Sequence, residues 1–129
     1  MEYLLDTVAV VRHFSGHGKI GQKAATILDH IETREDQLLI SAVSLMEILS
    51  LAEKHRIPVT LPQTLDLIES SSKYEVVNLN SAILRVAMAI SFPELHDRLI
   101  LATAKWLEIP IISSDHLFTG VPGISVVWD

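Results

Sequence analysis

Four acidic side chains of this 129-residue chain stand at the ends of expected strands and helices: Asp6, Glu47, Asp97 and Asp115. Carboxylates that crowd together repel one another, and a divalent cation usually relieves the repulsion. The sequence has no cysteine, so metal ligands would be oxygen atoms, which favour Mg²⁺ or Mn²⁺ over zinc. Such an ion orients a water molecule, lowers its pKa and stabilises charge that develops on a phosphoryl group. The chemistry that these residues suggest is metal-assisted hydrolysis of a phosphodiester.

Each acid taken alone also has a plainer interpretation as a helix cap. Asp6, Asp97 and Asp115 are of a residue type that accepts hydrogen bonds from the first backbone N–H groups of a helix. The segment from Ser44 to Glu47 matches a capping box, and we expect Ser44 to act as a cap rather than as a catalytic residue. Four acids on one edge of a domain are more than capping requires, so we favour the metal site.

The elements that must position these acids alternate along the chain. Apolar runs predict strands at residues 3–5, 38–40, 75–77, 109–113 and 124–128. Periodic or alanine-rich segments predict helices at residues 8–14, 19–32, 44–55, 61–70, 81–90 and 97–107. Strands that alternate with helices predict a mostly parallel sheet covered on both faces. We therefore expect a three-layer α/β/α sandwich with a central sheet of four to five strands.

Parallel topology places three of the four acids together. The carboxyl ends of parallel strands share one edge of the sheet, where ligands collect. Asp6 follows the first strand, Glu47 lies in the first helical turn after the second, and Asp115 follows the strand at 109–113. Asp97 follows a helix and a proline instead of a strand, so the predicted topology does not place it beside the other three.

Length and composition limit the class of protein. A chain of 129 residues with 49% hydrophobic residues predicts one well-packed domain over residues 1–129. The absence of cysteine fits a reducing compartment. The acidic N-terminus does not resemble a signal peptide, and no apolar run approaches the ~18 residues of a membrane span, so we expect a cytoplasmic protein without a membrane partner.

The net charge of −6 argues against a surface that is basic throughout, but it allows a local basic patch. Arg12, Lys19 and Lys23 lie in a segment without acids and are candidates for contacts with RNA phosphates. Arg98, beside Asp97, is a further candidate. The alternatives are an ordinary solvated helix end for the first three residues and a surface ion pair for Arg98.

Four segments in a fixed order give the chain a family resemblance: LLDT, SLMEIL, HDRLILATA and PIISSDHLF. Together they resemble the PIN-domain nucleases, specifically the small VapC-type toxins of prokaryotic toxin–antitoxin pairs. The resemblance implies a metal-dependent ribonuclease whose acidic site consists of Asp6, Glu47, Asp97 and Asp115. It also implies supporting hydroxyl groups at Thr7 and Ser113, a homodimer, and a cognate antitoxin protein bound over the early helices.

Other assignments stay open. His96 and His116 flank two of the acids, but adjacent residues point in different directions, so a direct role is the less favoured interpretation for each. Trp106 lies in an apolar segment and is expected in the core or at an interface. A receiver-type phospho-acceptor domain would need an adjacent acidic pair after the first strand, where this chain has Asp6-Thr7. A PIN-fold module that binds metal or RNA without cleaving it remains a second alternative.

Overall fold

The computed structural model describes all residues from 1 to 129 and contains a parallel sheet of five strands in the order β3-β2-β1-β4-β5. The strands are β1 (Glu2–Leu5), β2 (Gln37–Ser41), β3 (Tyr74–Val77), β4 (Ile111–Ile112) and β5 (Val126–Val127). Every neighbouring pair in this sheet is parallel. The predicted parallel sheet is therefore confirmed, although β4 and β5 are each shorter than their apolar segments suggested.

Six α-helices and two 3₁₀ helices connect the strands. The α-helices are α1 (Thr7–Ser15), α2 (Gln22–Leu28), α3 (Ala42–Glu53), α4 (Leu61–Glu69), α5 (Ser81–Met88) and α6 (Leu95–Leu107). The 3₁₀ helices are η1 (Ile31–Thr33) and η2 (His116–Gly120). No helix is both long and apolar enough to span a bilayer.

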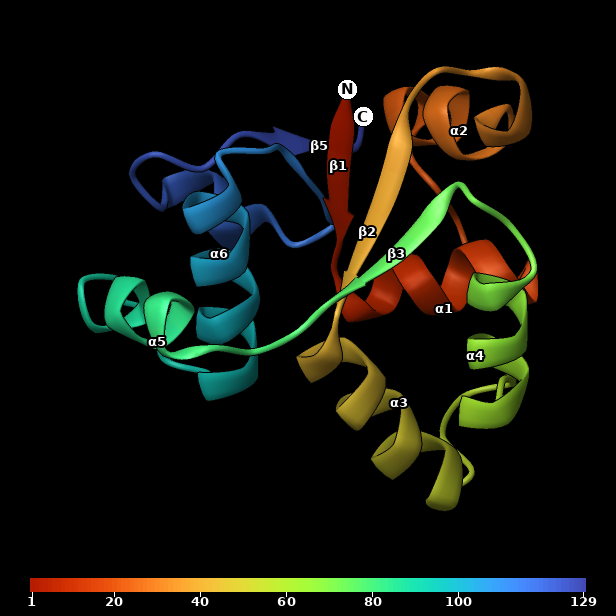
Figure 1. The fold of residues 1–129 in the computed structure, drawn as a ribbon, viewed down its shortest axis with the longest axis horizontal. Helices are drawn as coiled ribbons and strands as arrows, with labels where there is room; N and C mark the ends of the chain where they lie inside the picture. The colour runs from red at the N-terminus through yellow and green to blue at the C-terminus, as the bar shows by residue number, and fades with distance from the viewer.

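The sheet separates two apolar cores, as alternation along β1 requires, because neighbouring strand residues point to opposite faces. Leu5 packs with residues of α1 and α2 on one face, in the same cluster as Ile48 and Ile68. Leu4 packs on the other face with residues of α5 and α6. Figure 1 shows this division, with α5 and α6 on one side of the strands and α1, α2 and α4 on the other. The predicted three-layer sandwich is confirmed.

The strand order reverses beside β1. From β1 the chain continues to β2 and β3 on one side, whereas β4 and β5 pair on the other side. Leu5 is in register with Ile40 of β2 and with Ile112 of β4, so these three strands end at the same level. Ligands of open α/β sheets bind outside the carboxyl ends of the strands at such a switch point. A ligand site is therefore expected among the residues that follow Leu5, Ser41 and Ile112.

Three of the expected helix starts are wrong. The helix expected at residues 19–32 begins at Gln22, ends at Leu28 and is followed by the separate 3₁₀ helix η1. Helix α3 begins at Ala42, and Ser41 is its cap, accepting a hydrogen bond of 3.0 Å from the Val43 amide. Ser44 therefore lies inside the helix and is not a cap. Helix α6 begins at Leu95 with Glu94 as its cap, so Asp97 lies in the first turn instead of at the cap position.

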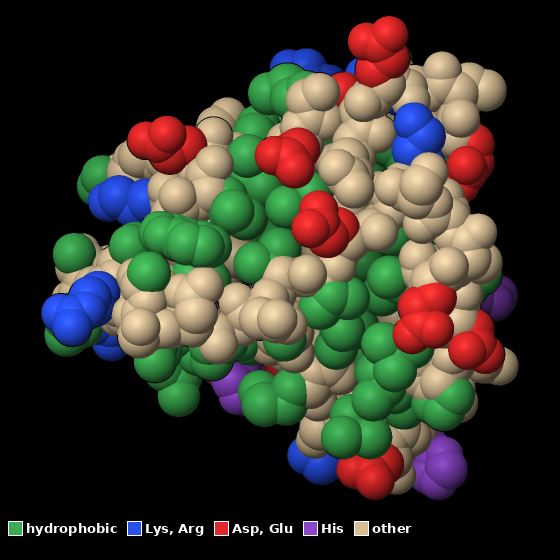
Figure 2. All heavy atoms as spheres, viewed as in Figure 1, with side chains coloured by type: hydrophobic (Ala, Val, Ile, Leu, Met, Phe, Trp, Pro, Cys, Tyr) green, Lys and Arg blue, Asp and Glu red, His purple; other side chains and the backbone are tan.

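The surface carries no broad basic platform on the face drawn in Figure 2, where Lys and Arg side chains are separated from one another among acidic and apolar groups. This pattern agrees with the net charge of −6. Phosphate contacts on a protein of this charge must come from a few local cations.

Candidate active site

Asp6 follows β1 directly and is buried, with 5% of its surface exposed. Its Oδ1 atom accepts a hydrogen bond of 2.9 Å from the Ala9 amide, which caps α1. Its Oδ2 atom accepts a hydrogen bond of 2.5 Å from the hydroxyl of Ser113. Burial raises the pKa of Asp6, the two hydrogen bonds oppose this change, and the charges of Asp115 and Glu47 add to it. Asp6 is thus both a cap and a member of an acidic cluster.

Ser113 links the ends of β1 and β4. It is buried, and its hydroxyl oxygen also accepts a hydrogen bond of 3.0 Å from the Asp115 amide. One side chain therefore fixes the Asp6 carboxylate and the backbone on which Asp115 is carried. The predicted hydroxyl beside the acids is present at this position, where it orients a carboxylate.

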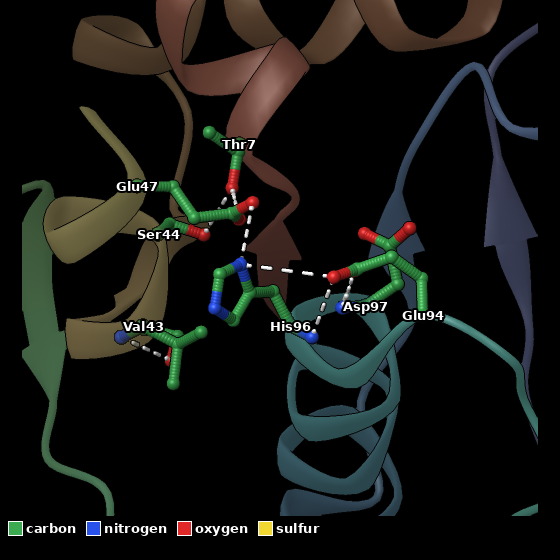
Figure 3. Close-up of polar contacts among 8 residues, drawn as sticks. Thr7, Val43, Ser44, Glu47, Glu94, His96 and Asp97 are labelled. Carbon is green, nitrogen blue, oxygen red and sulfur yellow. Dashed lines mark hydrogen bonds and ion pairs between the residues drawn. The ribbon is translucent and has the colours of Figure 1, made fainter. Parts of the chain in front are cut away.

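Glu47 lies on α3 and faces the start of α1. The hydroxyl of Thr7 donates a hydrogen bond of 2.5 Å to Glu47 Oε1, and it lies 3.0 Å from the hydroxyl of Ser44. The other carboxylate oxygen, Oε2, lies 3.2 Å from Nδ1 of His96 at the start of α6. Figure 3 shows how Thr7, Glu47 and His96 bridge three helices. Ser44 thus contacts the Thr7 hydroxyl and does not cap the helix.

Asp97 lies in the first turn of α6, where its backbone N–H donates a hydrogen bond of 2.7 Å to Glu94 Oε2. The pKa of its carboxyl is raised from 3.8 to about 6, mainly by burial. The charges of Glu94, Glu47, Asp115 and Asp6 raise the pKa further. Asp97 therefore lies within electrostatic reach of all three other predicted acids, which the predicted topology alone could not establish.

Asp115 caps the 3₁₀ helix η2, with its Oδ1 atom accepting a hydrogen bond of 2.9 Å from the Leu117 amide. Its charge raises the pKa of both Asp6 and Asp97. His116, the next residue, is exposed. The predicted cap is thus confirmed for Asp115, and its charge also acts on Asp6 and Asp97.

None of the four acids has a Lys or Arg partner. The basic side chain in contact with these acids is His96, whose Nδ1 lies 3.2 Å from Glu47 Oε2 and 3.7 Å from Glu94 Oε1. Arg98 points away and donates a hydrogen bond of 2.8 Å to the Ala87 carbonyl at the end of α5. Arg98 is therefore neither the predicted surface ion pair nor a counter-charge for the cluster.

The remaining basic candidates divide into two kinds. Arg12 donates a hydrogen bond of 2.8 Å to the Lys19 carbonyl, and its guanidinium lies over the ring of Trp128. Lys19 and Lys23 are exposed, and Lys23 lines a hollow that Asp115 also lines. Lys23 therefore shares a hollow with one of the predicted acids, Asp115.

The donor set fits a divalent cation. Two carboxyls with raised pKa and two further acids lie together without a Lys or Arg counter-charge, and repulsion of this kind is relieved by cation binding. As the side chains stand, no three acidic or histidine groups are arranged to ligate one ion.

Sequence reasoning missed Glu94. Its carboxylate caps α6 and, among the neighbouring charges, contributes most to the raised pKa of Asp97. The signal was present, since an acid three residues before Asp97 and directly after Pro93 is typical of a helix start. The side chain of Glu94 is half-exposed, so Glu94 lies between Asp97 and solvent.

Comparison with known proteins agrees with this architecture. The PIN domain family model matches residues 3–124. The structure is similar to that of VapBC2 from Rickettsia felis bound to a DNA fragment from its promoter, with a TM-score of 0.75, 17% identity and full coverage of both chains. It is also similar to a toxin–antitoxin complex from Klebsiella pneumoniae, with a TM-score of 0.65, 26% identity, and coverage of 97% of this chain and 95% of that one.

A third similar structure is DNA-bound VapBC from Salmonella typhimurium, with a TM-score of 0.70, 18% identity, and coverage of 98% of this chain and 97% of that one. No curated protein matches the sequence. The family match extends from β1 almost to β5 and includes all four predicted acids. The chain belongs to the PIN domain family.

Proposed function

We propose that this protein is a Mg²⁺- or Mn²⁺-dependent ribonuclease and the toxin of a toxin–antitoxin pair. The observation that supports the proposal is the electrostatic influence of Asp6, Glu47 and Asp115 on Asp97 near the switch point of the sheet, where none of these acids pairs with a Lys or Arg. The similarity to structures described as toxin–antitoxin complexes supports the biological role.

The four carboxylates would hold the ion directly or through water. When bound, the ion would lower the pKa of a water molecule and neutralise charge that develops on the phosphodiester. Ser113 would keep the Asp6 carboxylate oriented toward the ion, and Thr7 would do the same for Glu47. Ion binding would also lower the raised pKa of Asp97, because a cation favours the ionised carboxylate.

RNA and an antitoxin protein are the proposed partners, with the homodimer as the proposed assembly. The antitoxin is expected to be encoded beside the toxin gene. Expression of the chain should arrest growth, and co-expression of the adjacent reading frame should relieve the arrest. Growth that is unaffected by expression of a ribonuclease-active protein would contradict the toxin role while leaving the nuclease.

The site assignment is tested by RNA cleavage with Mg²⁺ or Mn²⁺. We expect the wild-type protein to cleave and the Asp6→Asn and Asp97→Asn variants to lose at least about 100-fold in rate, since each substitution removes a proposed metal ligand. Asp66→Asn is the matched control, because Asp66 is exposed on α4 and takes no part in the cluster. Equal activity in all four proteins would overturn the site assignment. Metal or RNA binding without cleavage would favour the non-catalytic module.

A further inference from the structure

A hollow of about 210 Å³ lies directly beside the acidic cluster and shares Ser113 and Asp115 with it. Lys23 of α2 and Trp128, which follows β5, also line it. Pockets for drug-sized ligands measure about 300–1,000 Å³. This smaller volume suits part of a polymer, such as one nucleotide, better than an independent small molecule.

The Trp128 side of the hollow is held in place by backbone contacts. The Ser113 amide donates a hydrogen bond of 3.2 Å to the Val127 carbonyl, and the Ala24 amide donates one of 3.1 Å to the Trp128 carbonyl. Gly21 allows the close approach, because a Cβ atom there would lie 2.2 Å from the Trp128 carbonyl oxygen. The end of the sheet is thus tied to the start of α2, which places Lys23 and Trp128 on the same hollow.

The indole ring is supported as well. The Arg12 guanidinium carbon lies 5.9 Å from the centroid of the Trp128 ring, within the range of a cation–π contact. Arg12 is itself held by its hydrogen bond to the Lys19 carbonyl. Arg12 therefore orients an aromatic ring at the edge of the site and is not free to pair with phosphate through all of its donors.

We infer that this hollow is a subsite for the nucleotide next to the scissile phosphate, with Trp128 stacking on its base and Lys23 pairing with its phosphate. The inference rests on the proposed ribonuclease function, which it deepens. Single-stranded nucleic acids are bound by this combination of a stacking surface and a backbone cation. Trp128 is suited to the role by position, whereas Trp106 lies on α6 and lines a different hollow with β2 and β3 residues.

Fluorescence of Trp128 tests the stacking without any need for cleavage. The chain has two tryptophans, so Trp106→Phe leaves Trp128 as the only one. In a Trp106→Phe, Asp97→Asn protein kept in EDTA, a ten-residue oligouridine or oligoadenosine is expected to quench the emission along the same saturation curve as the anisotropy of labelled RNA. Absence of quenching at saturating RNA, or absence of RNA binding, overturns the inference.

Cleavage kinetics separate this inference from the proposed function. If the wild-type protein cleaves RNA, Trp128→Ala should raise KM about 5- to 100-fold, as expected for the loss of one stacked base. Trp128→Phe should restore most of the loss, and Trp106→Ala is the matched control. Wild-type KM in Trp128→Ala would overturn the subsite while leaving the ribonuclease. Quenching by RNA in a chain that never cleaves would overturn the proposed function instead.

The phosphate contact has its own readout. Lys23→Gln should reduce the slope of log binding constant against log salt concentration by about 0.7, the value for one phosphate contact to a single strand. Lys105→Gln is the matched control, because Lys105 is exposed near the C-terminal end of α6 and lines a separate hollow with Pro110 and Gly123. An unchanged slope in Lys23→Gln, or an equal change in Lys105→Gln, overturns the role of Lys23.

Discussion

At the scale of single residues, ionisation of the Asp97 carboxyl opposes folding in the absence of metal. Its pKa in the folded protein is about 6, above the ordinary 3.8, so the folded state binds this proton more tightly than the unfolded state. Stability therefore falls as the pH rises from about 4 to 6, and the loss persists at neutral pH. Asp97→Asn should raise the free energy of unfolding at pH 7.5 by about 1 kcal/mol, a value reduced for partial exposure.

Urea denaturation in EDTA measures this effect. The gain from Asp97→Asn should shrink to roughly a third at pH 4.5, where the folded wild-type carboxyl is already protonated. Asp66→Asn serves as the control and should show no such dependence on pH. A destabilised Asp97→Asn protein at pH 7.5 would show that Asp97 makes favourable interactions that outweigh the charge repulsion.

The residue identities of the site could be proposed from the sequence to different degrees. The positions of Asp6 and Asp115 can be predicted from the strands alone, because each acid comes shortly after a short apolar run that predicts a strand. An acid at such a strand end is expected at the carboxyl edge of the sheet. Asp97 joins the predicted site only through the family resemblance, because its coupling to the other acids depends on how α6 packs in the folded protein. Ser44 is not the cap that the sequence predicts, because Ser41, another good cap residue, caps the helix three residues earlier.

At the scale of elements, the start of α6 controls the charge of the site. Glu94 caps this helix and has the largest effect on the pKa of Asp97 among the neighbouring charges. Glu94→Gln keeps a carbonyl oxygen that can accept a backbone hydrogen bond but removes the charge. The pKa of Asp97 should therefore move down from about 6.

Carboxyl ¹³C NMR titration in EDTA measures the Asp97 pKa directly. Glu69→Gln is the control, because Glu69 is exposed at the end of α4. An unchanged Asp97 pKa in Glu94→Gln would mean that burial and the charges of the other three acids, and not Glu94, keep the proton on Asp97.

Most elements followed from local patterns, and the errors lie at their ends. The helices were found because apolar residues recur at helical spacing, which is a property of the segment itself. The strands β4 and β5 contain two residues each, although the apolar segments 109–113 and 124–128 are longer. Apolar character continues into the connections because both segments lie over the α6 core, where Ile109 and Ile124 pack without pairing as strands.

At the scale of the whole molecule, the strand order decides which acids meet. The sequence predicts alternating strands and helices, but no local signal shows that β4 pairs with β1 instead of with β3. That pairing brings Ser113 to Asp6, a hydrogen bond across 107 positions of sequence. The proximity of Asp6 and Asp115 is therefore a consequence of sheet order, which the sequence predicts only on the assumption that the parallel strands share one edge.

Closure of the sheet against α2 depends on one glycine. A Cβ atom at Gly21 would lie 2.2 Å from the carbonyl oxygen and 2.8 Å from a ring carbon of Trp128, so Gly21→Ala must displace the segment after β5. Displacement of packed backbone typically costs about 1–3 kcal/mol, and we expect a loss of this size in urea denaturation. Gly120→Ala is the matched control, because nothing lies within 4 Å of its Cβ position, and it should change stability by less than about 0.5 kcal/mol. Equal stability of the two variants would show that the end of the chain can move away from α2 without loss, and that Trp128 is not held against the acidic edge by the fold.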